Sequence, residues 1–114
     1  MKNKFIISKN YHSSKGTTSS YIKNNDFTKI MSLFSRMLKA NQWKDYSFSH
    51  QKENLIFCFY RHSFETPIYK IVYEKKSNNF KIWTIYHQNN KVRSSSSLEK
   101  TIKWIESRYL KSIK

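Results

Sequence analysis

The residues of this sequence that could carry out covalent chemistry are few, and the closest group is His62, Ser63 and Glu65. These are the residue types of a nucleophilic triad, in which a histidine oriented by a carboxylate removes the serine proton. Residues this close together in a strand or turn point in different directions, so their side chains cannot converge unaided. We therefore predict no catalytic residues and a protein that is not an enzyme.

Metal and cofactor sites of the common kinds are also not expected. The histidines and the single cysteine show neither CxxC nor HxxxH spacing, the patterns that bring ligands to one metal ion; these residues are His12, His50, His62, His87 and Cys58. Phosphate-binding loops need glycine where the backbone approaches the ligand, and the only glycine is Gly16. We predict no metal ligands and no cofactor.

Positive charge is the strongest signal in the composition, because 22 lysines and arginines stand against 7 acidic residues and give a formal net charge of +15. An excess of this size favours a polyanionic partner, either nucleic acid or an acidic protein surface. The abundance of Lys, Asn and Ile is what an AT-rich genome imposes, and this bias explains lysine in place of arginine. It does not explain the shortage of acids, because the Asp and Glu codons are not rich in G and C.

The first functional hypothesis is a non-enzymatic nucleic-acid-binding module, for RNA in preference to DNA. Cations would neutralise phosphates, and exposed aromatic rings would stack on bases at about 1–3 kcal/mol each. The candidate phosphate contacts are Arg61, Lys70, Lys81, Lys91, Arg93, Lys100 and Lys103. The candidate stacking residues are Tyr60, Tyr69, Tyr73, Trp83 and Tyr86. The alternative is that the cations are ordinary solvated side chains and that the rings belong to a core covered by the helices.

The second hypothesis is a protein-interaction or assembly factor. Trp, Tyr and Arg anchor many protein interfaces, and two segments, residues 43–46 and 61–69, are rich in them. The predicted docking residues are Trp43, Tyr46, Glu65 and Tyr69. The alternative for Trp43 is that it fills the core at the end of a helix.

Residues 1–25 hold five lysines, no acid and no sustained hydrophobic period, which predicts a disordered basic tail. A mitochondrial or plastid transit peptide has the same composition and stays open as an alternative. The longest apolar run, residues 55–60, is too short to span a bilayer, and a single cysteine fits a reducing compartment. We predict a cytoplasmic protein without a membrane segment.

Residues 26–114 are predicted to form a single α+β domain. Asp26 is a candidate N-cap, and Asn41 can take the left-handed conformation that ends a helix. Between them, apolar residues recur at the spacing of one helical stripe; they are Phe27, Ile30, Met31, Phe34, Met37 and Leu38.

Beyond the first helix the hydrophobic period changes to two, which predicts a four-stranded antiparallel meander. Its strands comprise residues 46–49, 55–60, 68–74 and 80–86, with a turn at residues 78–79 and an end at residues 89–90.

A C-terminal helix follows, because Ser96 and Glu99 have the spacing of a capping box. Its apolar face holds Leu98, Ile102, Ile105 and Tyr109. Four core residues are predicted from these patterns, namely Phe34, Met37, Phe57 and Ile105.

The order of helix, strands and helix loosely resembles the double-stranded-RNA-binding fold, whose second helix presents basic residues to phosphates. The glycine-rich strand ends and paired lysines of that family are absent, and serines occupy residues 94–97 instead.

Two stretches resemble a more specific family. Residues 30–46, IMSLFSRMLKANQWKDY, are similar to its signature helix and the Trp-basic-Asp-Tyr element that follows. Residues 57–71, FCFYRHSFETPIYKI, are similar to its strand ending in basic residues, followed by Ser-x-Glu-x-Pro-x-Tyr. The family is an uncharacterised alphaproteobacterial one, domain of unknown function 2794, which usually has glycine where Asn41 stands. The resemblance implies an alphaproteobacterial source and carries no established activity.

Overall fold

The computed structural model describes residues 22–62, 66–77 and 80–112, and these residues form a five-stranded antiparallel sheet and two helices. The elements along the chain are α3 (Asn24–Lys39), β1 (Asp45–Gln51), β2 (Asn54–Tyr60), β3 (Tyr69–Ser77), β4 (Phe80–His87), β5 (Asn90–Ser95) and α4 (Leu98–Ser112). Strands adjacent in sequence are adjacent in the sheet, in the order β1-β2-β3-β4-β5. The predicted α+β class and antiparallel meander are confirmed.

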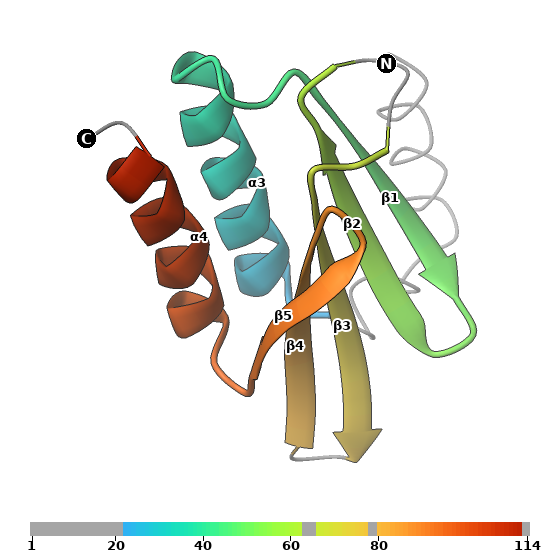
Figure 1. The fold of residues 1–114 in the computed structure, drawn as a ribbon. Helices are drawn as coiled ribbons and strands as arrows, with labels where there is room; N and C mark the ends of the chain where they lie inside the picture. The colour runs from blue at the N-terminus through green and yellow to red at the C-terminus, as the bar shows by residue number, and fades with distance from the viewer. Residues whose placement is uncertain (1–21, 63–65, 78–79, 113–114) are drawn as a thin grey trace.

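Both helices cover the same face of the sheet and run side by side in the same direction (Figure 1). Two ion pairs, Lys29–Glu99 and Arg36–Glu106, join equivalent turns of α3 and α4. In β2 the residues beneath the helices, Leu55, Phe57 and Phe59, are at most 1% exposed. The alternate residues of that strand are only half-buried. The opposite side of the sheet, which neither helix covers, is called the open face below.

The first helix begins earlier than the sequence pattern predicts. Its N-cap is Lys23, which makes no side-chain capping bond, and Asp26 lies within the first turn instead of capping it. The Asp26 side chain is nearly buried and pairs with Lys81 of β4 at 3.3 Å between Oδ2 and Nζ. Ile22 is 2% exposed within the core. The predicted boundary at residue 25 is therefore wrong for residues 22–25, and the rest of the predicted tail lies outside the described residues.

Asn41 ends α3 as predicted, with a left-handed φ of 62°. The chain then turns back, since the backbone N–H groups of Gln42 and Trp43 both donate to the carbonyl of Met37. This turn places the Trp43 ring parallel to that of Phe59, with 4.3 Å between centroids. Trp43 is 1% exposed and fills the core at the helix end.

The fifth strand, β5, was not predicted. Gln88 and Asn89 both have positive φ, of 51° and 71°, as the two central residues of a tight hairpin must. The chain therefore turns at these residues and continues as a strand, where the sequence suggested that the sheet ends. β5 is an edge strand with almost no buried side chain, and its one apolar residue, Val92, is 40% exposed. A strand without a buried face has no hydrophobic alternation to reveal it. The predicted turn at residues 78–79 lies outside the described residues.

Helix α4 is capped by Ser97, one residue after the predicted cap. The Ser97 hydroxyl oxygen accepts a hydrogen bond from the backbone N–H of Lys100 at 3.2 Å, and the Ser97 carbonyl accepts one from Thr101. Glu99 is then the second helical residue, so the chain has no capping box built on Ser96. The predicted apolar face is confirmed: Leu98, Ile102 and Ile105 are buried, and Tyr109 packs against the core.

Replacing Ser97 by alanine should lower the free energy of unfolding by about 1 kcal/mol, because the N–H of Lys100 loses its acceptor. Chemical denaturation followed by circular dichroism measures this change. Ser96→Ala is the matched control and should leave stability nearly unchanged. A larger loss for Ser96→Ala than for Ser97→Ala would contradict the assignment of the cap.

Three of the four predicted core residues are buried: Met37, Phe57 and Ile105 are at most 4% exposed. Phe34 is half-buried and packs against the edge of the core. The centre of the α3 stripe is instead Ile30, Leu33 and Met37, whereas Leu38 is 43% exposed. The apolar stripe is thus turned toward Leu33, a residue that the predicted stripe omits.

Candidate functional site

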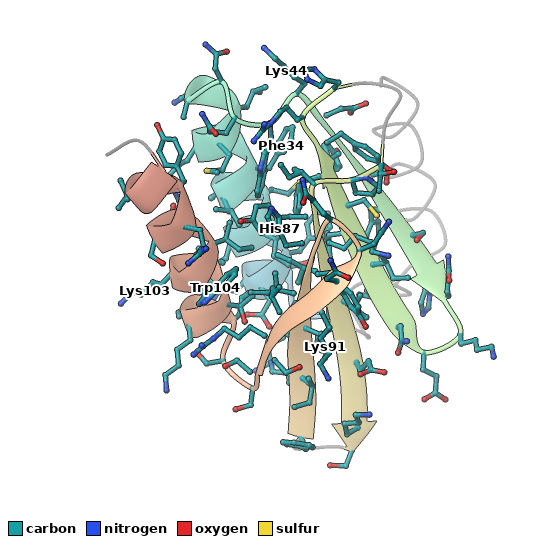
Figure 2. All side chains as sticks on the ribbon, viewed as in Figure 1. Phe34, Lys44, His87, Lys91, Lys103 and Trp104 are labelled. Atoms are coloured by element: carbon teal, nitrogen blue, oxygen red, sulfur yellow. The ribbon has the colours of Figure 1, made fainter. Side chains whose placement is uncertain are left out.

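The predicted phosphate contacts do not gather on one surface. Lys70 of β3 and Lys91 of β5 lie on the open face, because both are in register with Tyr86 of β4. Lys100 and Lys103 are exposed on α4, which covers the other face of the sheet. Figure 2 shows Lys103 pointing away from the sheet. These two pairs of lysines therefore face opposite sides of the molecule.

The remaining predicted contacts occupy three further places. Arg93 is exposed on the edge strand β5, and Arg61 is exposed just after the end of β2. Lys81 lies on the helix-covered face and pairs with Asp26. Because this ammonium group already has a carboxylate partner in a half-buried position, we remove Lys81 from the candidate phosphate contacts.

On the open face, one row of residues crosses all five strands, beginning at Ser47 of β1, which is opposite Cys58. Cys58, Lys70, Tyr86 and Lys91 are opposite one another in β2, β3, β4 and β5. The Lys70 ammonium lies over the Tyr86 ring, 5.2 Å from its centroid. Lys91 is exposed, and Lys70 and Tyr86 are half-buried. The row therefore presents an aromatic ring between two cations.

The aromatic stacking platform that the sequence suggested is not formed. Tyr69, Tyr73 and Trp83 are at most 9% exposed and lie beneath the helices, where no base can reach them. Tyr60 and Tyr86 are on the open face, but each has a polar contact there. The Tyr60 hydroxyl lies 3.2 Å from that of Ser47, and Lys70 covers one side of the Tyr86 ring. Of the five predicted stacking residues, only Tyr60 and Tyr86 are therefore left for a base, and a base on the covered side of Tyr86 would have to displace Lys70.

The predicted protein-docking surface is not available either. Trp43, Tyr46 and Tyr69 are 1%, 8% and 9% exposed, because Trp43 packs on Phe59, Tyr46 on Phe34 and Tyr69 on Trp43. Side chains buried in this way do not form an exposed surface on which another protein could dock. Glu65 lies outside the described residues.

A pocket that sequence reasoning missed lies between the last turns of α4 and the ends of β3 and β4. Its volume is about 190 Å³, and its polar lining residues are Gln42, Arg61, Tyr69, His87, Arg108 and Tyr109. The His87 ring stacks on that of Tyr69, with 4.6 Å between centroids, and His87 is half-buried. No sequence signal identified this group, because its members are scattered along the chain from Gln42 to Tyr109 with no motif spacing.

The two arginines determine the electrostatics of this pocket. Burial, followed by repulsion from Arg108 and Arg61, lowers the pKa of His87 from its ordinary value. Burial also raises the pKa of Tyr69, and the same two arginines oppose that rise. At neutral pH the pocket therefore holds two fixed positive charges, a neutral imidazole and a neutral phenol. Such an arrangement can bind an anion.

Neither a cluster of metal-ligating side chains nor a membrane-spanning helix is found among the described residues. No three His, Cys, Asp or Glu side chains within residues 22–62, 66–77 and 80–112 lie close enough together to hold a metal ion. In the same part of the chain, no helix has the length and apolar character needed to cross a bilayer. The cytoplasmic location stays a prediction.

Comparison with known proteins identifies one family. The sequence profile of a family described as "Protein of unknown function (DUF2794)" matches residues 21–102, which is well over half of the chain. The match starts next to the buried Ile22 and extends from the two resembling stretches through all five strands into α4. No curated protein and no solved structure matches the chain. The alphaproteobacterial source implied by the resemblance stays a prediction.

Proposed function

The chain belongs to the DUF2794 family, and we propose that this member is a non-enzymatic module that binds nucleic acid, RNA in preference to DNA, through its open face. The observation that carries the proposal is the row of Lys70, Tyr86 and Lys91, in which two lysines flank an aromatic ring. The next row, Ser49, Ile56, Val72, Thr84 and Ser94, contains no acid. A phosphate backbone lying across the strands thus meets positive charge without a competing carboxylate in these two rows.

The distribution of carboxylates supports the same proposal. Four of the acidic side chains in the described residues are paired with cations: Asp26 with Lys81, Glu74 with Lys76, Glu99 with Lys29, and Glu106 with Arg36. None of these pairs involves Lys70 or Lys91. No carboxylate of the described residues therefore competes with a polyanion for these two lysines, and phosphate neutralisation with release of counterions supplies most of the affinity.

The preference for RNA rests on architecture. Two helices on one face of an antiparallel sheet is the arrangement of the double-stranded-RNA-binding fold, whose second helix contacts phosphates. By that analogy Lys100 and Lys103 of α4 would carry the contacts. The analogy covers element order and layers only, since the sheet here has five strands. The open face and the α4 surface are thus two alternative locations that a mutational test can separate.

The test measures RNA affinity at about 50 mM and about 200 mM salt, since phosphate contacts make binding strongly salt-dependent. Fluorescence anisotropy with single-stranded RNA, double-stranded RNA and matched DNA should show tighter binding to RNA. The double variant Lys70→Ala/Lys91→Ala should weaken binding and reduce the slope of log affinity against log salt by about 1 per lysine.

The matched control for this test is Lys100→Ala/Lys103→Ala, which removes the same charge from the opposite side of the molecule. A larger loss of RNA affinity for the α4 pair would assign the interface to α4, as in the double-stranded-RNA-binding fold. Absence of binding to every RNA and DNA at the lower salt concentration would refute the proposed function. Equal competition by polyglutamate would identify an acidic protein surface as the partner instead.

A further inference from the structure

We propose that the pocket formed by Arg61, Arg108, His87 and Tyr69 is a binding site for the phosphate group of a phosphomonoester. This site is separate from the open face, because Tyr69 and His87 are in register with Phe59 on the helix-covered side of the sheet. Arg108 and Tyr109 also lie beyond the residues that the family profile matches. The inference therefore goes beyond the proposed function and does not depend on it.

The charged side chains that line the pocket favour a negatively charged ligand. No described lining residue is a carboxylate, and neither Arg61 nor Arg108 forms an ion pair with an acid of the described residues. Arg108 is instead held over the Trp104 ring, with 5.5 Å between the guanidinium carbon and the centroid. A guanidinium group presents a planar fork of N–H donors that matches two oxygens of a phosphate. Two guanidinium groups from separate parts of the chain match the double negative charge of a phosphate better than the single charge of a carboxylate.

The walls and the volume of the pocket further limit which anions can bind there. Met37, Trp43, Ile68 and Ile105 supply apolar walls, which lower the local dielectric and so strengthen electrostatic attraction beside them. A volume of about 190 Å³ corresponds to roughly six water molecules at about 30 Å³ each, enough for a phosphate group but not for a whole nucleotide. A wider hollow of about 580 Å³ shares Arg61 and Ile68 with the pocket and can take the organic part of the ester.

His87 is the group that reports on the anion. The polar and charged residues facing it are Tyr69 from β3, Arg108 and Tyr109 from α4, Arg61 after β2 and Gln42 after α3, and its register partner in β5 is Asn90. Burial and the two arginines lower its pKa in the free protein. A dianion opposes the repulsion from the arginines and favours the protonated imidazole, so binding must raise the pKa of His87. Affinity then increases as pH falls toward the free-state pKa, as long as the anion itself stays dianionic.

The experiment follows the His87 imidazole signals of the full chain by NMR in pH titrations without anion, with inorganic phosphate and with sulfate. Sulfate is included because it stays dianionic where phosphate takes up a proton. We expect both anions to raise the pKa of His87 and to leave the imidazole signals of the exposed His50, at the far end of the same sheet face, unchanged. No change at His87 in either anion at millimolar concentration would overturn the proposal, and so would an equal change at His50.

Mutations test the two guanidinium groups. Arg108→Gln and Arg61→Gln should each weaken phosphate binding by roughly tenfold, the loss expected for one charge-assisted hydrogen bond. Arg93→Gln removes an exposed arginine from β5, outside the pocket, and should bind phosphate as the unmodified protein does. Melting temperatures of all three variants check that they fold. Equal phosphate affinity in Arg93→Gln and Arg108→Gln would contradict the site.

Two ligands with the same terminal group distinguish the source of the phosphate. A 5′-phosphorylated oligonucleotide that binds more tightly than its 5′-hydroxyl counterpart, with the difference lost in Arg108→Gln, assigns the pocket to a nucleic-acid end. A nucleoside 5′-monophosphate that binds as well as the oligonucleotide assigns it to a small phosphomonoester. The Lys70→Ala/Lys91→Ala variant should keep phosphate binding in either case, so failure of the open-face proposal and failure of this one give different results.

Discussion

Replacing Phe57 by alanine should lower the free energy of unfolding by about 3–5 kcal/mol, a large part of the 5–15 kcal/mol that a small domain has. Phe57 is fully buried at the centre of β2, beneath α3. Its ring lies 4.9 Å from that of Phe48 in β1 and 5.9 Å from that of Phe27 in α3. Removing it leaves a cavity between the sheet and the helix that rigid neighbouring strands cannot close. Urea denaturation at equilibrium measures the change.

Ile56→Ala is the control for Phe57→Ala, because Ile56 is the preceding residue of the same strand and faces the open side. Ile56 is only half-buried, so its truncation should cost clearly less. Equal losses for the two variants would mean that both faces of β2 are equally buried, which contradicts the placement of both helices on one face.

The second large effect is expected for Trp43→Ala, again about 3–5 kcal/mol of stability. The Trp43 ring is stacked on Phe59 at 4.3 Å and lies 6.3 Å from Phe34, and it forms one wall of the phosphate pocket. The variant should therefore melt at a lower temperature and also bind phosphate less well. Thermal denaturation with and without phosphate measures both changes.

Lys44→Ala is the neighbouring control for Trp43→Ala, since the Lys44 side chain points outward at the surface (Figure 2). It should leave the melting temperature nearly unchanged. A Trp43→Ala protein of unchanged stability that has lost a protein partner would restore the docking interpretation of this residue.

Much of the fold follows from the sequence because burial leaves a regular pattern. The i, i+3, i+4 spacing after Asn24 and the alternation in β2 both record which side chains face the core. Asn41 also carries its own signal, since few residues other than glycine take a left-handed conformation easily. Where burial is absent, the pattern fails: β5 has no buried face, and nothing in its composition distinguishes it from a loop.

The candidate sites were less predictable than the fold. Net charge is a property of composition, but clustering of charge depends on strand register and on which face each residue occupies. Lys70 and Lys91 are 21 positions apart and meet only because β3, β4 and β5 are paired in this register. The aromatic residues were misleading for the same reason, because Tyr73 and Tyr86 look alike in the sequence yet lie on opposite faces of the sheet.

The order of the elements also governs how this domain can form during synthesis. Each strand pairs with its neighbour in sequence, so the sheet can assemble from local contacts as the chain leaves the ribosome. The apolar face of the sheet cannot be covered by local contacts in the same way, because α3 precedes the sheet and α4 follows it. Helix α4 contributes Ile105 to the core and the acidic partners of Lys29 and Arg36. Until α4 has emerged, the part of that face beneath it stays open to water. Nascent chains are therefore most prone to aggregate in the interval between completion of β4 and docking of α4.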